Sequence, residues 1–379
     1  MHVKNLELKN YRNYSSLSLN LNKGLNIFVG ENAQGKTNIV ESIYYLSGVK
    51  SHRTSRDSEL IKWDKDRAYI KADVVKAISD YTMEFLLSNE EKKAIKVNGI
   101  RINKISEVLG TVNVVIFSPE DLKLVKEGPA FRRKFIDNEL NQIRPKYHHA
   151  LLQYNRVLMQ RNNLLKSIKF SPSNRITAEV FSEQLAEYGS FLCDARNEFI
   201  KKLSLIARLI HRKITNGKEE LEIIYDCSIG KYKNKQETKK WLLKYYIEEM
   251  DTDIERGVTL KGPHRDDLII KINGFDTKIY GSQGQQRTAA LSLKLSEIEI
   301  IKSEVSEYPI LILDDVMSEL DLNRQKFLLE SLKDVQTILT CTSLNDINAF
   351  HFDNKDVFIV KNGNISKLKD INNNEIYNS

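Results

Sequence analysis

The segment GENAQGKT, residues 30–37, is the feature that most constrains what this chain can fold into. Its spacing of Gly, four residues, Gly, Lys and Thr is typical of a phosphate-binding loop. The apolar run at residues 25–29 is predicted to be a buried strand, and residues 38–46 follow with helical periodicity. A loop between a strand and a helix presents backbone N–H groups and a helix N-terminus to phosphates. An ordinary glycine-containing turn is the alternative, and the full motif in this context favours a nucleoside triphosphate site.

The residue types of this loop predict a role for each part. Glycine has no Cβ, so backbone N–H groups can turn inward around the phosphates. Lys36 is expected to bridge the β- and γ-phosphates and to be catalytic, and the Thr37 hydroxyl is expected to bind Mg²⁺. The nucleotide-binding residues predicted in this segment are Gly30, Glu31, Asn32, Ala33, Gln34, Gly35, Lys36, Thr37 and Asn38.

Two adjacent carboxylates predict the second half of the site. The sequence YPILILDD at residues 308–315 is an apolar run that ends in Asp314 and Asp315. Such a run is typical of a buried strand, and ligands gather at the carboxyl ends of strands in α/β sheets. Asp314 is expected to hold Mg²⁺ opposite Thr37, and Asp315 to orient or deprotonate the attacking water. A pair of helix-capping acids is the alternative.

The polar segment GSQGQQR, residues 281–287, lies directly before an amphipathic helix predicted over residues 288–301. Taken alone, it is a loop with a helix cap. Ser282, Gly284 and the N–H groups at a helix start can also bind a phosphate oxygen, as the first loop does. Two phosphate-binding segments indicate a shared nucleotide, so Ser282 is a further catalytic candidate.

The first third of the chain is predicted to be β-rich. Alternating or continuous apolar patterns indicate strands, and Asn98-Gly99 predicts a tight hairpin. The segment SPED at residues 118–121 indicates a helix start. The strands are expected at residues 3–8, 17–21, 68–75, 81–87, 94–97, 100–103 and 112–117.

Helical periodicity dominates from residue 122 to 214, with breaks expected at Pro145 and at residues 171–174. A strand at 220–225 and a helix at 239–255 follow, and Asn273-Gly274 predicts a hairpin between strands at 268–272 and 277–280. We therefore expect an ATPase domain in two parts, residues 1–120 and 258–379, interrupted by a helical insertion at residues 121–257.

Basic residues are concentrated in the predicted insertion. The 379-residue chain has a formal net charge of +7, and residues 131–170 contain nine Lys or Arg against two Asp or Glu. This segment is expected to face an anionic partner. The aromatic residues within and beside it favour core packing over base stacking; they are Phe131, Phe135, Tyr147 and Tyr154.

A second basic stretch, GVKSHRTSRDS at residues 48–58, contains His52, Arg53 and Arg56. It is either a solvated loop or a loop that touches the phosphates of a nucleotide or of DNA. Elsewhere, the three cysteines stand far apart without a C-x-x-C pair, which argues against a disulfide framework and a zinc site. The N-terminus has no apolar signal core and no run is long enough to span a membrane, so a soluble, cytoplasmic protein is expected.

The order of these motifs along the chain resembles that of the SMC-like branch of the ABC-type ATPases. The shared order is phosphate loop, helical insertion, Ser-x-Gly-x-x signature, strand ending in Asp, and Ser-x-Leu-Asp, here residues 318–321. Four further motifs resemble the bacterial recombination and gap-repair members of that branch, and together the motifs cover nearly the whole chain. They are FSPEDL at 117–122, RRKFID at 132–137, GPHRDD at 262–267 and SQGQQR at 282–287.

The resemblance implies an α/β P-loop NTPase head of the ABC (SMC-like) type, with a mixed β-sheet and an inserted helical lid subdomain. It implies ATP as the nucleotide and a head-to-tail homodimer, in which the phosphate loop of one subunit faces Ser282 of the other. Similar proteins bind double-stranded and single-stranded DNA at gaps and junctions, act with RecR and RecO to load RecA, and serve replication forks and the SOS response. Arg12 matches an arginine that such heads place on the nucleotide phosphates.

The sequence departs from the wider ABC pattern at its catalytic positions. Asp315 stands where transporters carry a catalytic Glu, and residues 340–343 (TCTS) offer hydroxyls where a switch histidine is usual. ABC-type ATPases usually carry a glutamine in a loop after a strand. No clear glutamine occupies such a loop here, unless residues 118–121 take its role. Slow hydrolysis by a weak, DNA-dependent ATPase is therefore expected.

Two other classes of protein share parts of this pattern. A transporter ATPase subunit would have the same site chemistry, but the basic helical insertion suits DNA better than a membrane partner. A non-hydrolysing adaptor that uses ATP only to dimerise also fits, because Asp315 replaces the usual Glu. Binding to duplex DNA and measured ATP turnover distinguish these alternatives.

Overall fold

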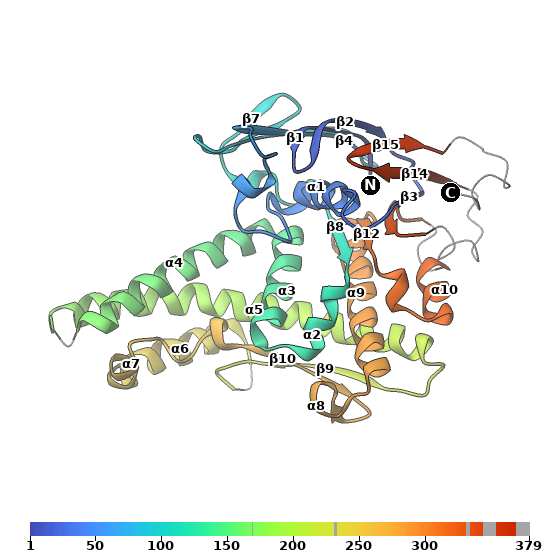
Figure 1. Cartoon of the computed structure of the whole chain (residues 1–379). Coiled ribbons are helices and arrows are strands. Elements are labelled where there is room, and N and C mark those ends of the chain that lie inside the picture. Colours follow the sequence, from blue (N-terminus) through green and yellow to red (C-terminus); the bar gives the residue numbers. More distant parts are fainter. Residues whose placement is uncertain (169, 231–232, 331–333, 344–353, 369–379) are drawn as a thin grey trace. The chain divides into compact units, whose positions relative to one another are not determined.

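The structure, a computed structural model, describes residues 1–168, 170–230, 233–330, 334–343 and 354–368. The chain forms two compact units, and each is described by itself. Unit 1 comprises residues 1–121 and 298–379, and unit 2 comprises residues 122–297. The N-terminal part and the C-terminal part of the chain thus build unit 1 together (Figure 1).

An antiparallel sheet in the order β2-β1-β4-β5-β6-β7 forms one layer of unit 1. Its strands alternate buried and exposed side chains, as expected for a sheet with one face on the core. The Asn98-Gly99 turn has φ of 50° and 78°, the left-handed conformation that a two-residue hairpin requires. The strands are β1 (His2–Tyr11), β2 (Tyr14–Asn20), β4 (Arg67–Val75), β5 (Tyr81–Ser88), β6 (Ala94–Val97) and β7 (Ile100–Ile102).

The second sheet of unit 1 has the order β15-β14-β3-β13-β12-β8 and is parallel except for β15. Its central strands are buried on both faces, which explains their continuous apolar sequences. Helix α1 (Lys36–Gly48) packs its apolar side chains into a core shared with both sheets. The strands are β3 (Leu25–Val29), β8 (Val114–Phe117), β12 (Ile310–Asp314), β13 (Thr337–Cys341), β14 (Lys355–Lys361) and β15 (Asn364–Lys367).

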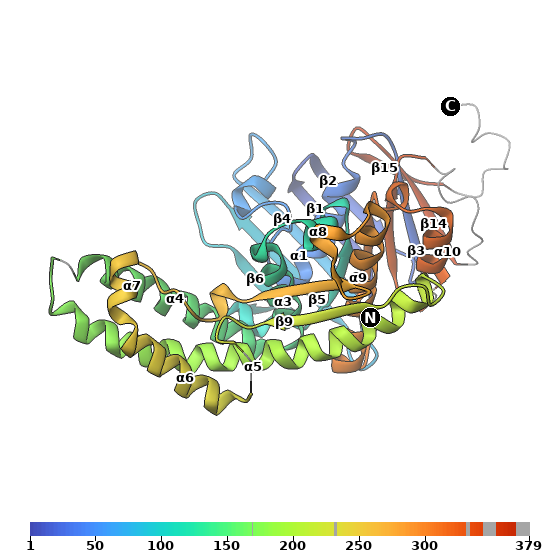
Figure 2. The ribbon, with the colours of Figure 1, turned by 90° about the horizontal axis from the view of Figure 1, so that it is seen from below.

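Unit 2 is built on long helices. Helices α4 (Pro145–Ser167) and α5 (Asn174–Ile214) run side by side, and α6 (Lys235–Glu248) packs along α5 (Figures 1 and 2). A small antiparallel sheet of order β11-β10-β9 completes this unit. The other elements are α2 (Lys123–Lys126), α3 (Pro129–Ile143), β9 (Leu221–Asp226), α7 (Met250–Arg256), β10 (Asp267–Ile272), β11 (Phe275–Asp276) and α8 (Thr277–Tyr280). Helix α9 (Gln283–Val305) belongs to unit 2 up to Glu297, and α10 (Leu322–Glu330) belongs to unit 1.

The structure differs from the sequence-based expectation in three places. The helix expected at 239–255 is divided at Glu249, and in α7 the carboxylate of Asp253 forms a buried ion pair with Arg161. The strand expected at 277–280 is the short helix α8, because the Asp276 side chain accepts the Lys278 N–H at 2.8 Å and caps a helical turn. Unit 2 extends to Glu297, beyond the expected boundary at 257, because β10 pairs with β9.

Candidate nucleotide site

The phosphate loop occupies the turn between β3 and α1, as its sequence predicts. Gly35 has φ of 116°, which side chains rarely adopt, and a Cβ there would lie 2.5 Å from Asn13 Nδ2. At Gly30 a Cβ would lie 2.3 Å from the Val360 carbonyl oxygen. Both glycines are therefore required by the close approach of neighbouring backbone and side chains.

Lys36 points back over its own loop. Its Nζ donates hydrogen bonds to the carbonyl oxygens of Gly30 (2.5 Å) and Glu31 (2.8 Å), and the residue is only 7% exposed. Burial lowers the pKa of the Lys36 ammonium, while the carboxylate of Asp315 raises it. The ammonium group thus lies inside the curve of the loop, where the phosphate-bridging role places it.

Neighbouring segments brace the loop. Asn13 Nδ2 and the Gly363 N–H both donate to the Gln34 carbonyl oxygen, at 3.2 and 3.3 Å. The Tyr14 hydroxyl donates to the Gly35 carbonyl oxygen at 3.1 Å. The loop is consequently held in one conformation by the β1–β2 turn and the β14–β15 turn, and this preorganisation lowers the entropic cost of binding a ligand.

Asp314 lies at the carboxyl end of β12, directly across from the start of α1. The Thr37 hydroxyl donates to Asp314 Oδ1 at 3.4 Å, although the two residues are 277 positions apart. Burial raises the pKa of the Asp314 carboxyl, and the adjacent Asp315 adds to this effect. A hydroxyl and a buried carboxylate form the hard oxygen donor set that suits Mg²⁺.

Thr340 on β13 orients both carboxylate residues, a role that the sequence reading missed. Its hydroxyl donates to Asp314 Oδ1 at 2.7 Å and accepts the Asp315 N–H at 3.0 Å. The parallel register pairs Asp314 with Thr340, and the hydroxyl is buried. The sequence showed hydroxyls at residues 340–343. It did not show that Thr340 lies within β13 and pairs with Asp314 of β12.

Arg12 contacts a carboxylate of α1. Its Nε and Nη2 donate to Glu41 Oε2 and Oε1, both at 2.8 Å, and its Nη1 donates to the Glu59 carbonyl oxygen at 2.8 Å. The basic loop at residues 48–58 lies beside the same helix, with Arg53 Nη1 3.0 Å from Asn38 Oδ1. Of the two alternatives for that loop, this position favours a contact with nucleotide phosphates.

Ser282 and Gly284 belong to unit 2. Ser282 Oγ accepts the Gln285 N–H at 3.2 Å, and Gln285 Oε1 accepts the Ser282 N–H at 2.9 Å, so the pair forms a capping box at the start of α9. The Ser282 side chain is exposed. The helix cap and an exposed hydroxyl at a helix N-terminus, both expected from the sequence, therefore occur together.

The basic residues at 131–170 divide between the interior and the surface, so only part of this surplus is placed to face an anionic partner. Arg161 is fully buried and pairs with Asp253 at 2.7 Å, and Arg132 pairs with Asp267 at 2.6 Å. Lys169 lies outside the described residues. On α4 the exposed basic side chains are Lys146, Arg156 and Lys166. As expected from their helical spacing, Phe135, Tyr147 and Tyr154 are buried in the core, whereas Phe131 is exposed.

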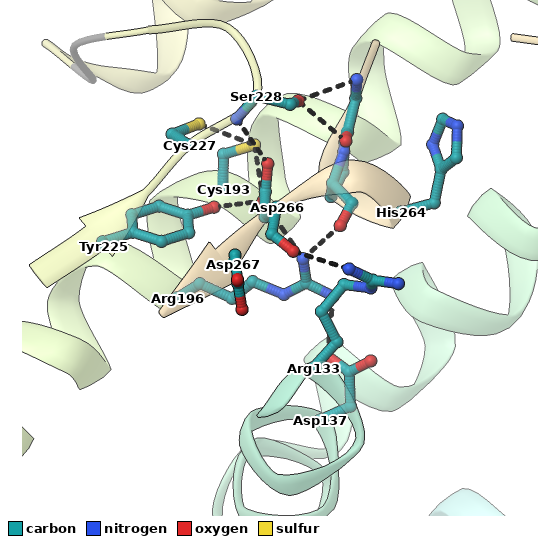
Figure 3. Close-up of polar contacts among 12 residues, drawn as sticks. Arg133, Asp137, Cys193, Arg196, Tyr225, Cys227, Ser228, His264, Asp266 and Asp267 are labelled. Atoms are coloured by element: carbon teal, nitrogen blue, oxygen red, sulfur yellow. Dashed lines mark hydrogen bonds and ion pairs between the residues drawn. The ribbon is translucent and has the colours of Figure 1, made fainter. Parts of the chain in front are cut away.

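The motif GPHRDD forms a buried polar network in unit 2 (Figure 3). Asp266 Oδ2 lies 3.1 Å from Arg196 Nη1 and accepts the Tyr225 hydroxyl at 2.5 Å, while Asp266 Oδ1 accepts the Ser228 N–H. Cys193 and Cys227, distant in sequence, lie with their sulfur atoms 3.9 Å apart beside this carboxylate. Burial lowers the pKa of His264 to about 4, so its ring is neutral and hydrogen-bonds Tyr154 and the Thr259 carbonyl.

The fold and the loop define the class: a P-loop head in which an Asp-terminated strand meets the phosphate loop. The sequence profile described as "RecF/RecN/SMC N terminal domain" matches residues 2–365. The chain is 51% identical over 368 residues to the DNA replication and repair protein RecF of Alkaliphilus oremlandii, covering 96% of this chain and all of that protein. It is 48% identical over 369 residues to RecF of Clostridium beijerinckii, covering 96% and 98%.

A solved structure, described as the recombination mediator protein RecF with ATPγS in the RecFOR pathway, superposes with a TM-score of 0.91. Its sequence is 40% identical, and the match covers 97% of this chain and 98% of that one. This chain belongs to the RecF family of DNA replication and repair proteins. In the described part of the chain, none of the helices is both long enough and apolar enough to cross a membrane.

Proposed function

We propose that this protein is an ATP- and Mg²⁺-dependent DNA-binding protein of recombinational gap repair and replication-fork maintenance. The observation that carries the proposal is the meeting of the phosphate loop with the Asp314 carboxylate, through Thr37. ATP-bound and ATPγS-bound structures of similar RecF proteins support ATP as the nucleotide. The RecFOR pathway named for those proteins supports action with RecO and RecR. The loading of RecA at gaps and a part in the SOS response belong to the proposal on the family resemblance alone.

The residues of the site have separate tasks in this proposal. Residues 30–38 enclose the phosphates, and the Lys36 ammonium exchanges its two carbonyl contacts for the β- and γ-phosphates. Thr37 and Asp314 would hold Mg²⁺, which would neutralise charge on the phosphates. Asp315 orients or deprotonates the attacking water, and its short side chain suits the slow turnover of a weak DNA-dependent ATPase.

The proposed dimer places Ser282 and Gly284 of one subunit on the ATP held by the other. The exposed Ser282 hydroxyl at the N-terminus of α9 supports this role, because helix N-termini bind anions. ATP then stabilises the dimer, and hydrolysis weakens it. The bound DNA is double- or single-stranded, at gaps and junctions, and the exposed basic side chains of α4 support such a contact.

The rival classes are distinguished by specific observations. A transporter subunit shares the phosphate loop, but the membership of this chain in the RecF family supports DNA as the partner. A non-hydrolysing adaptor would bind ATP and dimerise without turnover. Phosphate release measured with and without duplex DNA separates that adaptor from a slow ATPase.

Lys36→Ala tests the proposed site directly. The substitution removes the positive charge aimed at the phosphates and leaves both loop glycines, so ATP binding should fall by at least about 100-fold while the fold persists. Filter binding measures affinity, and far-UV circular dichroism monitors folding. Lys36→Arg is the matched control that keeps the charge and should retain measurable binding. Wild-type ATP affinity in Lys36→Ala would place the nucleotide elsewhere.

A further inference from the structure

Glu41 is a charged side chain of unit 1 that the proposed chemistry does not use. It lies on α1, next to the phosphate loop, and is 0% exposed. Its two carboxylate oxygens accept hydrogen bonds from Arg12 Nε and Nη2 at 2.8 Å, and Oε1 also accepts the Ser51 hydroxyl at 2.5 Å. A fully buried carboxylate is costly unless it is paired and hydrogen-bonded, and Glu41 is both.

The same carboxylate organises the basic loop after α1. Arg53 Nη1 lies 3.6 Å from Glu41 Oε2. Ser51, which donates to Glu41, accepts the N–H groups of Arg53 (2.9 Å) and Thr54 (3.1 Å) through its own oxygen. The loop therefore folds over Glu41, and both the backbone and the side chain of Arg53 are positioned by it.

Asn38, in the first turn of α1, connects these groups to the phosphate loop. Its Nδ2 donates to Asn13 Oδ1 at 2.8 Å, and its Oδ1 accepts Arg53 Nη1 at 3.0 Å. Asn13 in turn donates to the Gln34 carbonyl of the loop. Arg12, Arg53 and the phosphate loop thus form one hydrogen-bonded assembly around two residues of a single helix.

The electrostatics of this assembly favour an anion. Burial alone would raise the pKa of the Glu41 carboxyl, but hydrogen bonds from Arg12 and Ser51 outweigh it and lower the pKa, so Glu41 is ionised. One buried negative charge then holds two guanidinium groups.

Both guanidinium groups retain capacity for a ligand. A guanidinium has five N–H donors, and among the described residues Arg12 uses three of them, two on Glu41 and one on the Glu59 carbonyl. Arg53 has a side chain 45% exposed to solvent. The carboxylate therefore fixes the direction of each arginine without occupying all of its donors.

We propose that Glu41 is a positioning residue for nucleotide binding, which holds Arg12 and Arg53 at the phosphate loop in the orientation that receives the phosphates of ATP. This inference rests on the proposed function, since it takes ATP as the ligand. Glu41 itself does not touch the nucleotide. Its contribution passes through the two arginines, and it preorganises them before the ligand arrives.

A double-mutant cycle tests this role. Glu41→Gln keeps the size of the side chain and removes its charge, so ATP should bind about tenfold more weakly, the loss typical of a displaced charge-assisted hydrogen bond. In an Arg12→Ala/Arg53→Ala background the same substitution should cause no further loss, because there is nothing left to position. Isothermal titration with a non-hydrolysable ATP analogue measures each corner of the cycle.

The outcomes separate the possible explanations. An equal fold-loss in both backgrounds would show that Glu41 acts through general stability, and unchanged affinity in Glu41→Gln would also overturn the inference. If Glu41→Gln does not fold, Arg53→Gln tests the inference instead, because Arg53 is exposed and can be replaced without disturbing the core. Weaker ATP binding by Arg53→Gln is the expected result, and unchanged binding would overturn the inference. If wild-type protein and Lys36→Ala bind ATP equally, the proposed function itself fails, which is a different result from loss of the Glu41 effect alone.

Discussion

Thr340 shows how a single hydroxyl can set the geometry of a carboxylate that we propose as a metal ligand. The group donates to Asp314 and accepts from the backbone of Asp315, so it holds the end of β12 in place. Its donated hydrogen bond also lowers the pKa of Asp314 against the effect of burial. Thr340 therefore favours the ionised carboxylate that Mg²⁺ requires.

Thr340→Val is expected to weaken the binding of Mg²⁺ with ATP while sparing ATP binding without metal. Valine has the same shape but leaves the Asp314 oxygen and the Asp315 N–H short of a partner, at a stability cost of about 1–3 kcal/mol. Titration of ATP with and without Mg²⁺ measures the effect, and Thr340→Ser is the control that restores the hydroxyl. Identical magnesium dependence in Thr340→Val and wild type would contradict the assigned role.

The residues predicted from sequence are those whose role depends on local chain order. The phosphate loop, with Lys36 and Thr37, is predicted from the spacing of eight consecutive residues. Asp314 is predicted from an apolar run that ends in two aspartates. Thr340 and Glu41 act through partners 26 and 29 positions away, which no local pattern specifies. Long-range packing decides such pairs, so they become visible only in the folded chain.

At the scale of elements, α4 separates two kinds of basic residue that composition cannot distinguish. The helix sequence contains no Asp or Glu. Arg161 faces inward, where Asp253, Ser182 and Thr259 hydrogen-bond its guanidinium. Arg156 and Lys166 face solvent. The period of the helix, and not the local charge, determines which cation can reach a phosphate.

Neutralising Arg156 and Lys166 together is therefore expected to weaken DNA binding without unfolding the protein. If each side chain neutralises one phosphate, the slope of log affinity against log salt should fall by about 1.8, at about 0.9 per phosphate. Fluorescence anisotropy with a gapped duplex, over a range of salt concentrations, measures that slope. Lys96→Gln/Lys104→Gln, a pair of exposed lysines in unit 1, is the control.

Arg161→Gln should behave differently from the exposed pair. It leaves the Asp253 carboxylate buried without its cation, which costs about 3–5 kcal/mol, so the loss should appear in urea unfolding and not in the salt slope. A salt slope that stays at the wild-type value after loss of Arg156 and Lys166 would move the DNA contact away from α4.

The secondary-structure elements that were predicted correctly also depend on local sequence, whereas those that differ depend on side-chain and strand contacts that the pattern does not specify. Strand β3 and the Asn98-Gly99 hairpin lie where their sequence patterns predict them, because apolar periodicity and a left-handed turn are local properties. Helix α8 lies where a strand was expected. The side chain of Asp276 caps a helical turn there, and this contact competes with continued hairpin pairing after Asn273-Gly274. Unit 2 continues past residue 257 because β9 pairs with β10, and the paired residues are 41 to 51 positions apart in the sequence.

At the scale of the whole molecule, the proposed ATP site divides its groups between the two units of the chain. Lys36, Thr37 and Asp314 belong to unit 1, while Ser282 belongs to unit 2. In a head-to-tail dimer each ATP would contact the first three on one subunit and Ser282 on the other. Such a composite site makes dimerisation depend on the nucleotide, because the γ-phosphate is part of the interface.

Mixing two defective variants tests this composite site. Lys36→Ala lacks the loop cation, and Ser282→Arg places bulk and charge on the surface meant for the partner's phosphate, so neither should dimerise with ATP alone. Their mixture contains one composite site with two intact halves, because the Lys36 of one variant can face the Ser282 of the other. Sedimentation velocity should therefore detect an ATP-dependent heterodimer, limited to part of the mixture because only one of its two sites is intact.

ADP in place of ATP is the control and should leave monomers. Monomers in every mixture, with wild type dimerising under the same conditions, would contradict a site shared in this way; a wild type that stays monomeric with ATP would reject the clamp itself.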